Sequence, residues 1–471
     1  MRNLLFLSVF LFSLAGCASW RPQPVPTLEL PDTWGQAASG QSAKLTAEWW
    51  GLYNDAALDA LIKEADEHNR DLALAAARVD EARALVNVVN AQLFPSIDLT
   101  AQADRTQASK VSPLPLPASA LERSGYRTQF NVSYEIDFWG RLRGAGAAAR
   151  ADLLATEAAR DTVRVALTAD VVRGYYSVRA LDDQLAAMRR ALLLRDDSLK
   201  LQRVRAEAGL AGEYQLRQLQ AEAAAARAQI PALERELQAE VLALATLVGR
   251  NPSAITNAAI TRGAAQEMLA PAMVPEGLPS ELLLRRPDIA QAEQRVIAAG
   301  ARIQVLRAAL YPRIALTGYL GSESRLLSDL LSGPSVIWQL AFALAQPVFQ
   351  AGRSQAEVTA AQARERQALT QYQKTVQGAF REVAAALSAQ TRSREVFEAE
   401  TARAQLLEDA LKLARIRFDN GLTSQLELID AERSLLAARF NRIEALRSQR
   451  VAVADLARAL GGGWSAAPRA P

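Results

Sequence analysis

Four short segments of the chain alternate regularly between apolar and polar residues. This period of two predicts β-strands with one apolar and one polar face. The same rule holds in segments 97–101, 314–320 and 336–344. The clearest case is segment 126–137. Its apolar-face positions are Tyr126, Thr128, Phe130, Val132, Tyr134 and Ile136. The pattern fits strands that cross a membrane with lipid on one side and water on the other, or half-buried strands of a soluble sandwich.

The small number of strands and the length of the neighbouring helices favour the membrane interpretation. Residues 141–207 and 353–419 are rich in Ala, Leu, Arg, Glu and Gln, which are good helix formers. A helix of roughly 65 residues is on the order of 100 Å long, too long for a compact sandwich. Four strands cannot close a barrel, and an open sheet in lipid leaves backbone groups unpaired. Several chains must therefore share one barrel.

The chain also repeats itself. Leu93-Phe94-Pro95 matches Leu310-Tyr311-Pro312 at an offset of 217, and Gly209-Leu210 matches Gly421-Leu422 at an offset of 212. Each half therefore has the order helix, two strands, long helix, shorter helix. The predicted divisions are a signal peptide (1–16), an N-terminal arm (17–70), a first repeat (71–250), a Pro-rich linker (251–287), a second repeat (288–462) and a C-terminal tail (463–471).

The amino end has the form of a targeting segment. Arg2 precedes an apolar run that is too short to span a membrane, and the run ends Leu14-Ala15-Gly16-Cys17. Cys17 is the single cysteine of the chain and stands at the expected cleavage point. The segment resembles a bacterial lipoprotein signal, which implies that Cys17 carries a covalent lipid and, with Ala18 after it, that the protein is sorted to the outer membrane.

Composition excludes several classes of function. The net charge is +3 without a dense basic block, so no nucleic-acid partner is expected. One His and one Cys exclude His/Cys metal sites and Ser-His or Cys-His triads within one chain. The run Gly144-Ala145-Gly146 with Ala149 fits a dinucleotide fingerprint, but the strand before it alternates and a nucleotide site is not expected. We expect no catalysis and no cofactor besides the lipid.

Residues 415–430 predict a tight turn between two long helices. Asn420-Gly421 tolerates positive φ and so can end the first helix. Ser424 and Glu427 have the capping-box spacing that begins the next one. Glu427 and Asp430 therefore lie in the first turns of the second helix, where acids are favoured in any case.

These features together resemble the outer-membrane efflux channels of the TolC/OprM family, and most closely the lipoprotein branch that serves resistance-nodulation-division (RND) pumps. The resemblance is carried by Leu14–Cys17, the run Leu278–Ile289, the Phe94-Pro95 and Tyr311-Pro312 corners, and Gly421–Asp430. It implies a homotrimer with a 12-stranded transmembrane β-barrel, four strands from each chain, continued by a long periplasmic α-helical barrel. A periplasmic adaptor protein and an inner-membrane RND pump are the implied partners, and the function is passive export of drugs or other small toxic molecules.

The resemblance also implies two sites. Leu426, Glu427 and Asp430 match the periplasmic gate of the family, where three chains would place six carboxylates around the axis. The tips Gly209, Leu210, Gly421 and Leu422 would meet the adaptor, although glycine at these positions is equally expected as a helix C-cap. Some relatives have Tyr and Arg where Phe418 and Thr423 stand, so a hydroxyl-based lock is not expected at Phe418.

Other functions remain open on the sequence alone. The chain could be the outer-membrane component of a type I protein secretion or a metal-efflux system. It could also be a periplasmic coiled-coil adaptor lipoprotein, although the duplicated strand pairs argue against that class. An acid-base hydrolase has no cluster of residues to support it.

Overall fold

The computed structural model describes residues 48–111, 117, 121–209, 212–257, 260–262 and 286–462. The chain divides into two units, each described by itself. The sheet unit contains the described residues of Arg78–Glu157 and Gln291–Gln373. The hairpin unit contains those of Leu28–Ala77, Ala158–Ala290 and Lys374–Pro471. Two long helices, α4 (Arg141–Glu207) and α9 (Arg353–Asp419), contribute to both units.

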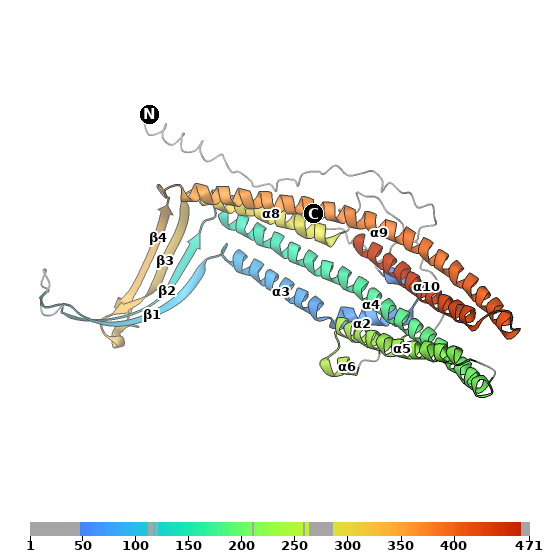
Figure 1. Cartoon of the computed structure of the whole chain (residues 1–471). Coiled ribbons are helices and arrows are strands. Elements are labelled where there is room, and N and C mark those ends of the chain that lie inside the picture. Colours follow the sequence, from blue (N-terminus) through green and yellow to red (C-terminus); the bar gives the residue numbers. More distant parts are fainter. Residues whose placement is uncertain are drawn as a thin grey trace, which may run out of the picture. The chain divides into compact units, whose positions relative to one another are not determined.

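The sheet unit contains one four-stranded antiparallel sheet (Figure 1). Its order is β1 (Ser96–Gln107), β2 (Glu122–Glu135), β3 (Arg313–Ser324) and β4 (Val336–Ala345). The turns η4 (Leu327–Asp329) and η5 (Gly333–Ser335) lie between the last two strands. Strands β1 and β4 form the edges, so each has one side without a neighbouring strand within the chain.

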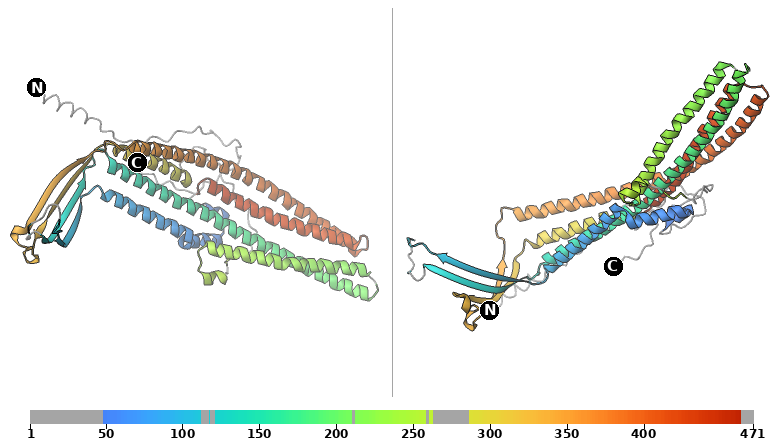
Figure 2. Two further views of the ribbon diagram at one scale, coloured as in Figure 1. Left: turned by 60° about the vertical axis from the view of Figure 1, so that its left-hand side comes forward. Right: turned by 90° about the horizontal axis from the view of Figure 1, so that it is seen from below.

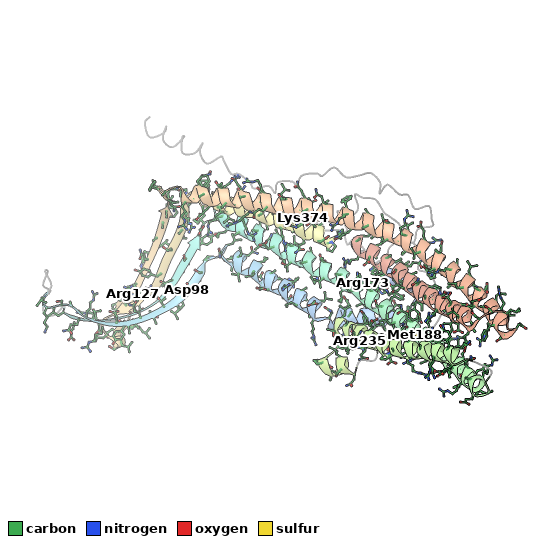
Figure 3. The ribbon with its side chains drawn as sticks, viewed as in Figure 1. Asp98, Arg127, Arg173, Met188, Arg235 and Lys374 are labelled. Carbon is green, nitrogen blue, oxygen red and sulfur yellow. The ribbon has the colours of Figure 1, made fainter. Side chains whose placement is uncertain are left out.

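The register of the sheet confirms the predicted division into two faces. One row crosses all four strands, and its members are Leu99, Phe130, Leu320 and Trp338. These side chains stay exposed in the single chain, Trp338 by 73%. On the other face Arg127 of β2 pairs with Glu323 of β3 at 2.5 Å, and Asp98 lies on the neighbouring strand (Figure 3). An apolar face that is exposed across its whole width requires an apolar environment.

Strand β2 begins four residues earlier and ends two residues earlier than the alternation predicted. It begins at Glu122, because the backbone pairing with β1 continues as far as Gln107. It ends at Glu135, and Asp137 has a different role from the predicted one. The Asp137 carboxylate accepts hydrogen bonds from the N–H groups of Leu142 (3.0 Å) and Arg143 (2.9 Å), and so satisfies free donors at the start of α4.

The helices of the sheet unit pack closely where small residues face one another. They are the parts of α4 and α9 in this unit, together with most of α3 (Arg70–Ala91) and of α8 (Pro287–Ala308). A Cβ at Gly144 would lie 3.3 Å from Val305 of α8, and one at Gly146 would lie 2.7 Å from Asn90 of α3. The glycines of the apparent fingerprint therefore lie inside a helix and permit helix packing.

Aromatic rings gather where the strands meet the helices. The rings of Trp139 and Tyr311 stack at 4.6 Å between centroids, and Phe138 packs against Trp139 edge to face at 4.8 Å. The Trp139 indole donates a hydrogen bond to the carbonyl of Pro312 at 2.9 Å. Aromatic residues with a polar edge are typical of the boundary between lipid and water.

The hairpin unit consists of two antiparallel helix pairs and a short N-terminal segment (Figure 2). Helix α4 turns back into α5 (Glu213–Leu247), and α9 turns back into α10 (Gln425–Ala459). The segment η2 (Trp49–Tyr53) and α2 (Ala56–His68) supplies Trp49, Leu58 and Leu61 to the main core, which includes Val171, Val172, Tyr175 and Leu244 of α4 and α5. The linker contains the five-residue helix α6 (Pro252–Thr256), and its residues 263–285 lie outside the described part.

Hydrogen bonds of buried polar groups hold the N-terminal segment of η2 and α2 against the helices. Tyr53 donates to the backbone carbonyl of Arg450 at 2.6 Å, and Tyr175 donates to Asp55 at 2.7 Å. The guanidinium of Arg450 lies 4.9 Å from the ring centroid of Tyr176. Burial raises the pKa of Tyr176 beyond the titration range of an ordinary phenol, so its hydroxyl stays protonated.

The lengths of the elements confirm the internal repeat. Helices α4 and α9 each contain 67 residues, α5 and α10 each contain 35, and α3 and α8 each contain 22. In the second half of α4, Leu185, Met188 and Leu199 are buried. None of the helices in the described ranges combines the length and the apolar character needed to cross a membrane.

Substituting Gly249 tests how the repeat closes on the N-terminal segment. Gly249 ends α5 at φ 82°, and a Cβ there would overlap the carbonyl of His68. Gly352 has the same φ of 82° but open space around its Cβ. We expect Gly352→Ala to cost about 1 kcal/mol from backbone strain alone. Gly249→Ala should lower the free energy of unfolding by this same strain and by about a further 1–3 kcal/mol from overpacking.

Thermal unfolding of both variants in detergent, followed by circular dichroism at 222 nm, measures the difference. The midpoint for Gly249→Ala falls below that for Gly352→Ala. Equal midpoints would contradict the close contact between Gly249 and the end of α2.

Candidate functional site

The turn between α9 and α10 has the hydrogen bonds of a Schellman motif. Gly421 adopts φ 71°, its N–H donates to Phe418 O at 2.9 Å, and the N–H of Leu422 donates to Arg417 O at 2.8 Å. The Asn420 side chain donates to Ile416 O at 2.7 Å. The predicted tight turn is confirmed, and the carbonyl groups at the end of α9 find partners within it.

The start of α10 uses Ser424 as predicted and Glu427 in a different way. The Ser424 hydroxyl accepts a hydrogen bond from the N–H of Glu427 at 3.3 Å. In a full capping box the Glu427 carboxylate would bond back to the N–H of Ser424. Instead it accepts a hydrogen bond from the hydroxyl of Thr423. Glu427 therefore has a local structural partner in this arrangement.

Asp430 and Leu426 differ from Glu427, because neither side chain has a hydrogen-bond partner in the turn. Asp430 is exposed, and no hydrogen bond or ion pair of its carboxylate is found within the described ranges. Leu426 and Leu422 are 57% and 69% exposed. Leu428 and Ile429, which lie between Leu426 and Asp430 in the sequence, are buried. The same turn of helix thus presents an acid and two large apolar side chains outward and anchors itself through the other face.

The equivalent turn of the first repeat lacks the acids. Gly209 has φ 71°, its N–H donates to Ala206 O at 3.0 Å, and Leu210 lies outside the described residues. Helix α5 begins at Gly212 without a side-chain cap. Gln215 and Gln218 stand where the second repeat has Glu427 and Asp430. Helix α5 has a different acid, Glu213 at its first residue, which pairs with Arg217 at 3.0 Å. The acids at the two predicted gate positions therefore occur in only the second of these two hairpins.

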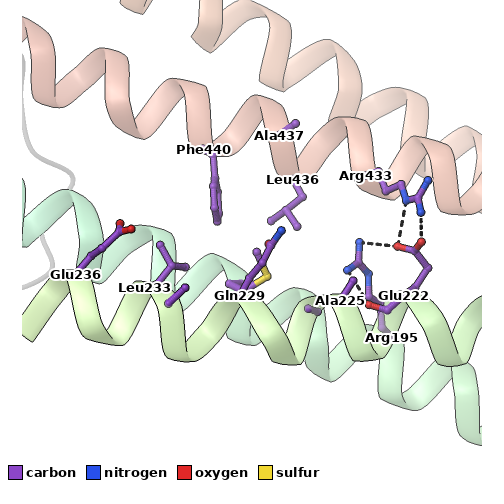
Figure 4. Close-up of a pocket in the computed structure, with 13 residues that line it drawn as sticks. Arg195, Glu222, Ala225, Gln229, Leu233, Glu236, Arg433, Leu436, Ala437 and Phe440 are labelled. Carbon is purple, nitrogen blue, oxygen red and sulfur yellow. Dashed lines mark hydrogen bonds and ion pairs between the residues drawn. The ribbon is translucent and has the colours of Figure 1, made fainter.

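An ionic cluster that the sequence did not predict lies one helix turn beyond Asp430 (Figure 4). Glu222 of α5 lies between Arg195 of α4 and Arg433 of α10. Burial raises the pKa of the adjacent Glu432, against the opposing charges of Arg195 and Arg415. A cavity of about 550 Å³ adjoins the cluster, and Leu233, Leu436 and Phe440 are among its lining residues. No sequence signal marked Glu222, which stands in an alanine-rich stretch.

Cys17 lies outside the described residues. Among the residues that are described, no group of three or more His, Cys, Asp or Glu side chains is placed to hold a metal ion.

Comparison with known proteins identifies relatives over nearly the whole chain. Residues 61–250 and 278–462 match the family described as "Outer membrane efflux protein". The chain is 34% identical to outer membrane protein OprJ of Pseudomonas aeruginosa, over 96% of this chain and 94% of OprJ. It is 33% identical to the toluene efflux pump outer membrane protein TtgI of Pseudomonas putida, over 97% of each chain. It is 30% identical to the probable outer membrane lipoprotein SilC of Salmonella typhimurium, over 98% of this chain and all of SilC.

A solved outer membrane channel has the same fold as this chain. The outer membrane channel CmeC of Campylobacter jejuni superposes with a TM-score of 0.89 over 95% of each chain, at 24% identity. The two matched segments of the family correspond to the two repeats and include both helix hairpins and the sheet. The chain belongs to the outer membrane efflux protein family, the TolC/OprM type of outer-membrane channel.

Proposed function

We propose that this chain forms a homotrimeric, passive conduit of a tripartite efflux system, in which a periplasmic adaptor and an inner-membrane RND-type pump supply the cargo and the energy. One observation carries the proposal. The sheet has an apolar face exposed across four strands and two edges with no neighbouring strand in the chain. In a bilayer every backbone N–H and C=O group must be paired, so an open sheet of this kind needs further strands.

Three copies solve this problem. Edge β4 of one chain can pair with edge β1 of the next, and three chains of four strands close a 12-stranded barrel. The face with Arg127 and Glu323 then lines the water-filled interior, and the face with Phe130 and Trp338 contacts lipid. The helices of the chain continue the tube on the periplasmic side, and an acyl chain on Cys17 adds an anchor.

The assembly can be tested directly. The purified mature chain, with Cys17→Ala to remove the lipid, is expected to remain a trimer that needs detergent, because the apolar sheet face requires burial. Light scattering coupled to size exclusion in detergent measures the mass, and heating before electrophoresis converts the trimer to monomer. A water-soluble monomer in detergent-free buffer would remove the basis of the proposal.

We propose that Leu426, Glu427 and Asp430 form the periplasmic gate. The structure leaves Leu426 and Asp430 exposed at the first turns of α10, where a neighbouring chain can meet them. Around a threefold axis the two acids make six carboxylates, which favour cations over anions at the mouth. Leu426 would form the apolar constriction beside them.

Truncating the acids should widen and neutralise this mouth. We expect Asp430→Ala to raise single-channel conductance about twofold or more, and to lower the ratio of potassium to chloride permeability, because a side chain and its charge leave the constriction. Planar bilayer recordings measure both quantities. Asp409→Ala is the control, since Asp409 is an exposed acid of α9 paired with Lys412 at 3.0 Å. Unchanged conductance in the double Glu427→Ala, Asp430→Ala variant would exclude the gate.

We propose that the adaptor contacts the two tips around Gly209, Leu210, Gly421 and Leu422. A Cβ on Gly209 or Gly421 would meet no atom within 4 Å, so the backbone there is open to a partner. Leu422 beside the second turn is 69% exposed, and an exposed large apolar side chain at such a place is typical of a protein interface.

Site-specific crosslinking tests the docking. A photoreactive residue at Leu422 should crosslink to the cognate adaptor when the three components are expressed together. The same residue at Leu406, which is 71% exposed on the shaft of α9, serves as the control. Crosslinking at Leu406 but not at Leu422, or at neither, would place the adaptor elsewhere.

The proposed cargo is drugs or other small toxic molecules. The relative TtgI is named for toluene efflux, and this chain is collinear with it over 97% of its length. A passive tube needs no chemistry and no resident cofactor of its own, so we propose no catalytic residue. Deleting the gene and screening growth against drugs, solvents and metal salts identifies the cargo, and metal sensitivity alone would favour a metal-efflux system.

A further inference from the structure

The two repeats pair their strands in the same register. In the first repeat Ser96 of β1 lies opposite Ser133 of β2, and in the second Arg313 of β3 lies opposite Ala345 of β4. Ser96 and Arg313 are 217 positions apart, and Ser133 and Ala345 are 212 positions apart. These are the two offsets of the sequence repeat. The equivalence of the repeats therefore holds to the residue in the folded sheet as well as in the sequence.

Strands β2 and β3 join the first repeat to the second, and we call this contact the internal junction. Asn131 of β2 lies opposite Tyr319 of β3, on the polar face of the sheet. The N–H of Ile136 donates to Ile314 O at 2.9 Å, and along an antiparallel ladder hydrogen-bonded pairs alternate with pairs that lack these bonds. Counted along the ladder from Ile136, Asn131 and Tyr319 form a pair without hydrogen bonds between them.

We propose that β4 of one chain joins β1 of the next chain in the register that joins β2 to β3 within the chain. The offset of 212 converts β2 into β4, and the offset of 217 converts β3 into β1. Asn131 then corresponds to Ala343, and Tyr319 corresponds to Gln102 of the next chain. This inference rests on the proposed trimer, and it adds the pairing of residues across each interchain junction, where β4 and α9 of one chain meet β1 and α3 of the next.

The two faces of the sheet leave few alternative registers. Successive side chains of a strand point to opposite faces, so a slip of one residue would bring the polar face of one chain beside the apolar face of the next. A slip of two residues keeps the faces, and it places Thr100 or Asp104 opposite Ala343 instead of Gln102. Such a slip moves the next chain by about 7 Å along the strand. The helices attached to the strands distinguish these registers.

Exposed residues of α3 and α9 favour the register without a slip. Inside the chain, a Cβ on Gly144 of α4 would lie 3.3 Å from Val305 of α8. The same offsets convert Gly144 into Ala356 of α9, and Val305 into Val88 of α3. Val88 is 60% exposed in the single chain, and Ala356 is exposed too. In the proposed register Val88 of the next chain packs on Ala356, whereas a slip of two residues separates them.

The interchain junction differs from the internal junction in charge. Arg127 and Glu323 form an ion pair across β2 and β3. The corresponding residues are Gln339 and Thr106 of the next chain, and both are neutral. Backbone hydrogen bonds and side-chain packing therefore hold the interchain junction, so cysteines can be introduced there without removing an ion pair.

Disulfide formation between introduced cysteines measures the register. Residues that face each other without hydrogen bonds have Cα atoms about 4.5 Å apart, within the range of about 4.4–6.8 Å that a disulfide needs. Diagonal neighbours are about 7–8 Å apart and lie outside this range. Ala343 and Gln102 stand on the two edge strands of the sheet (Figure 1), so a bond between them joins two chains.

The experiment uses the mature full-length chain with Cys17→Ala, Ala343→Cys and Gln102→Cys, oxidised by copper phenanthroline in detergent. We expect a covalent trimer that survives boiling and returns to monomer with a reducing agent, because three disulfides close the ring. Chains with only one introduced cysteine give the background.

The matched controls move one cysteine by two residues. Ala343→Cys combined with Thr100→Cys or with Asp104→Cys should crosslink about tenfold more slowly or less, because the Cα atoms lie outside disulfide range. Thr100→Cys should crosslink rapidly with Ala345→Cys, which corresponds to the internal pair of Ser133 and Thr317. This second pair also carries the test if Gln102→Cys prevents assembly.

The outcomes separate this inference from the proposed function. Faster crosslinking of either shifted pair than of the two matched pairs overturns the register. Trimers that form without crosslinking of any pair also overturn it, because β4 and β1 then do not meet. Absence of a heat-modifiable trimer in the chain without introduced cysteines overturns the proposed function instead.

Discussion

Backbone groups at the two edges of the sheet impose the constraint on which the rest of the molecule depends. Strands β1 and β4 each offer a row of N–H and C=O groups that no strand of the same chain pairs. In water such edges are tolerated, but beside an apolar face as wide as that of Leu99, Phe130, Leu320 and Trp338 they are not. A chain of this design is complete only as part of a larger cylinder, so oligomerisation is a condition of its fold in lipid.

The two repeats build this architecture from one folding pattern used twice, and their sequences have diverged. The helices of the two copies agree in length to the residue, and both tips use a glycine at φ 71°. The copies differ at the helix starts, where Gln215 and Gln218 correspond to Glu427 and Asp430. Helix α5 begins with an acid at another position, Glu213, so a helix start of this kind does not require acids at the positions of Glu427 and Asp430. The two copies therefore differ in charge at positions that the shared fold leaves free.

Much of the fold could be predicted because its signals are local. Helix formers dominate the stretch between Gly140 and Gly209, and alternation marks the strands, so the ends of α4 and α9 were predicted to the residue. The misplacement of β2 has a local cause too. Asp137 continues the alternation but caps α4, and only the backbone contacts show which role it takes. Glu222 could not be found in the same way, because its partners stand 27 and 211 residues away and its neighbours are alanines.

The exposure of charged side chains decides how firmly an ion pair can hold two helices together. A closure made entirely of buried ion pairs would be costly to break, because each separated charge would lose its partner without gaining water. A closure made of exposed pairs alone would contribute little stability. Glu222 combines the two cases, with Arg195 buried on one side and Arg433 at the solvent boundary on the other. The interaction is therefore strong enough to position α10, and breaking it exposes only the charge that water can already reach.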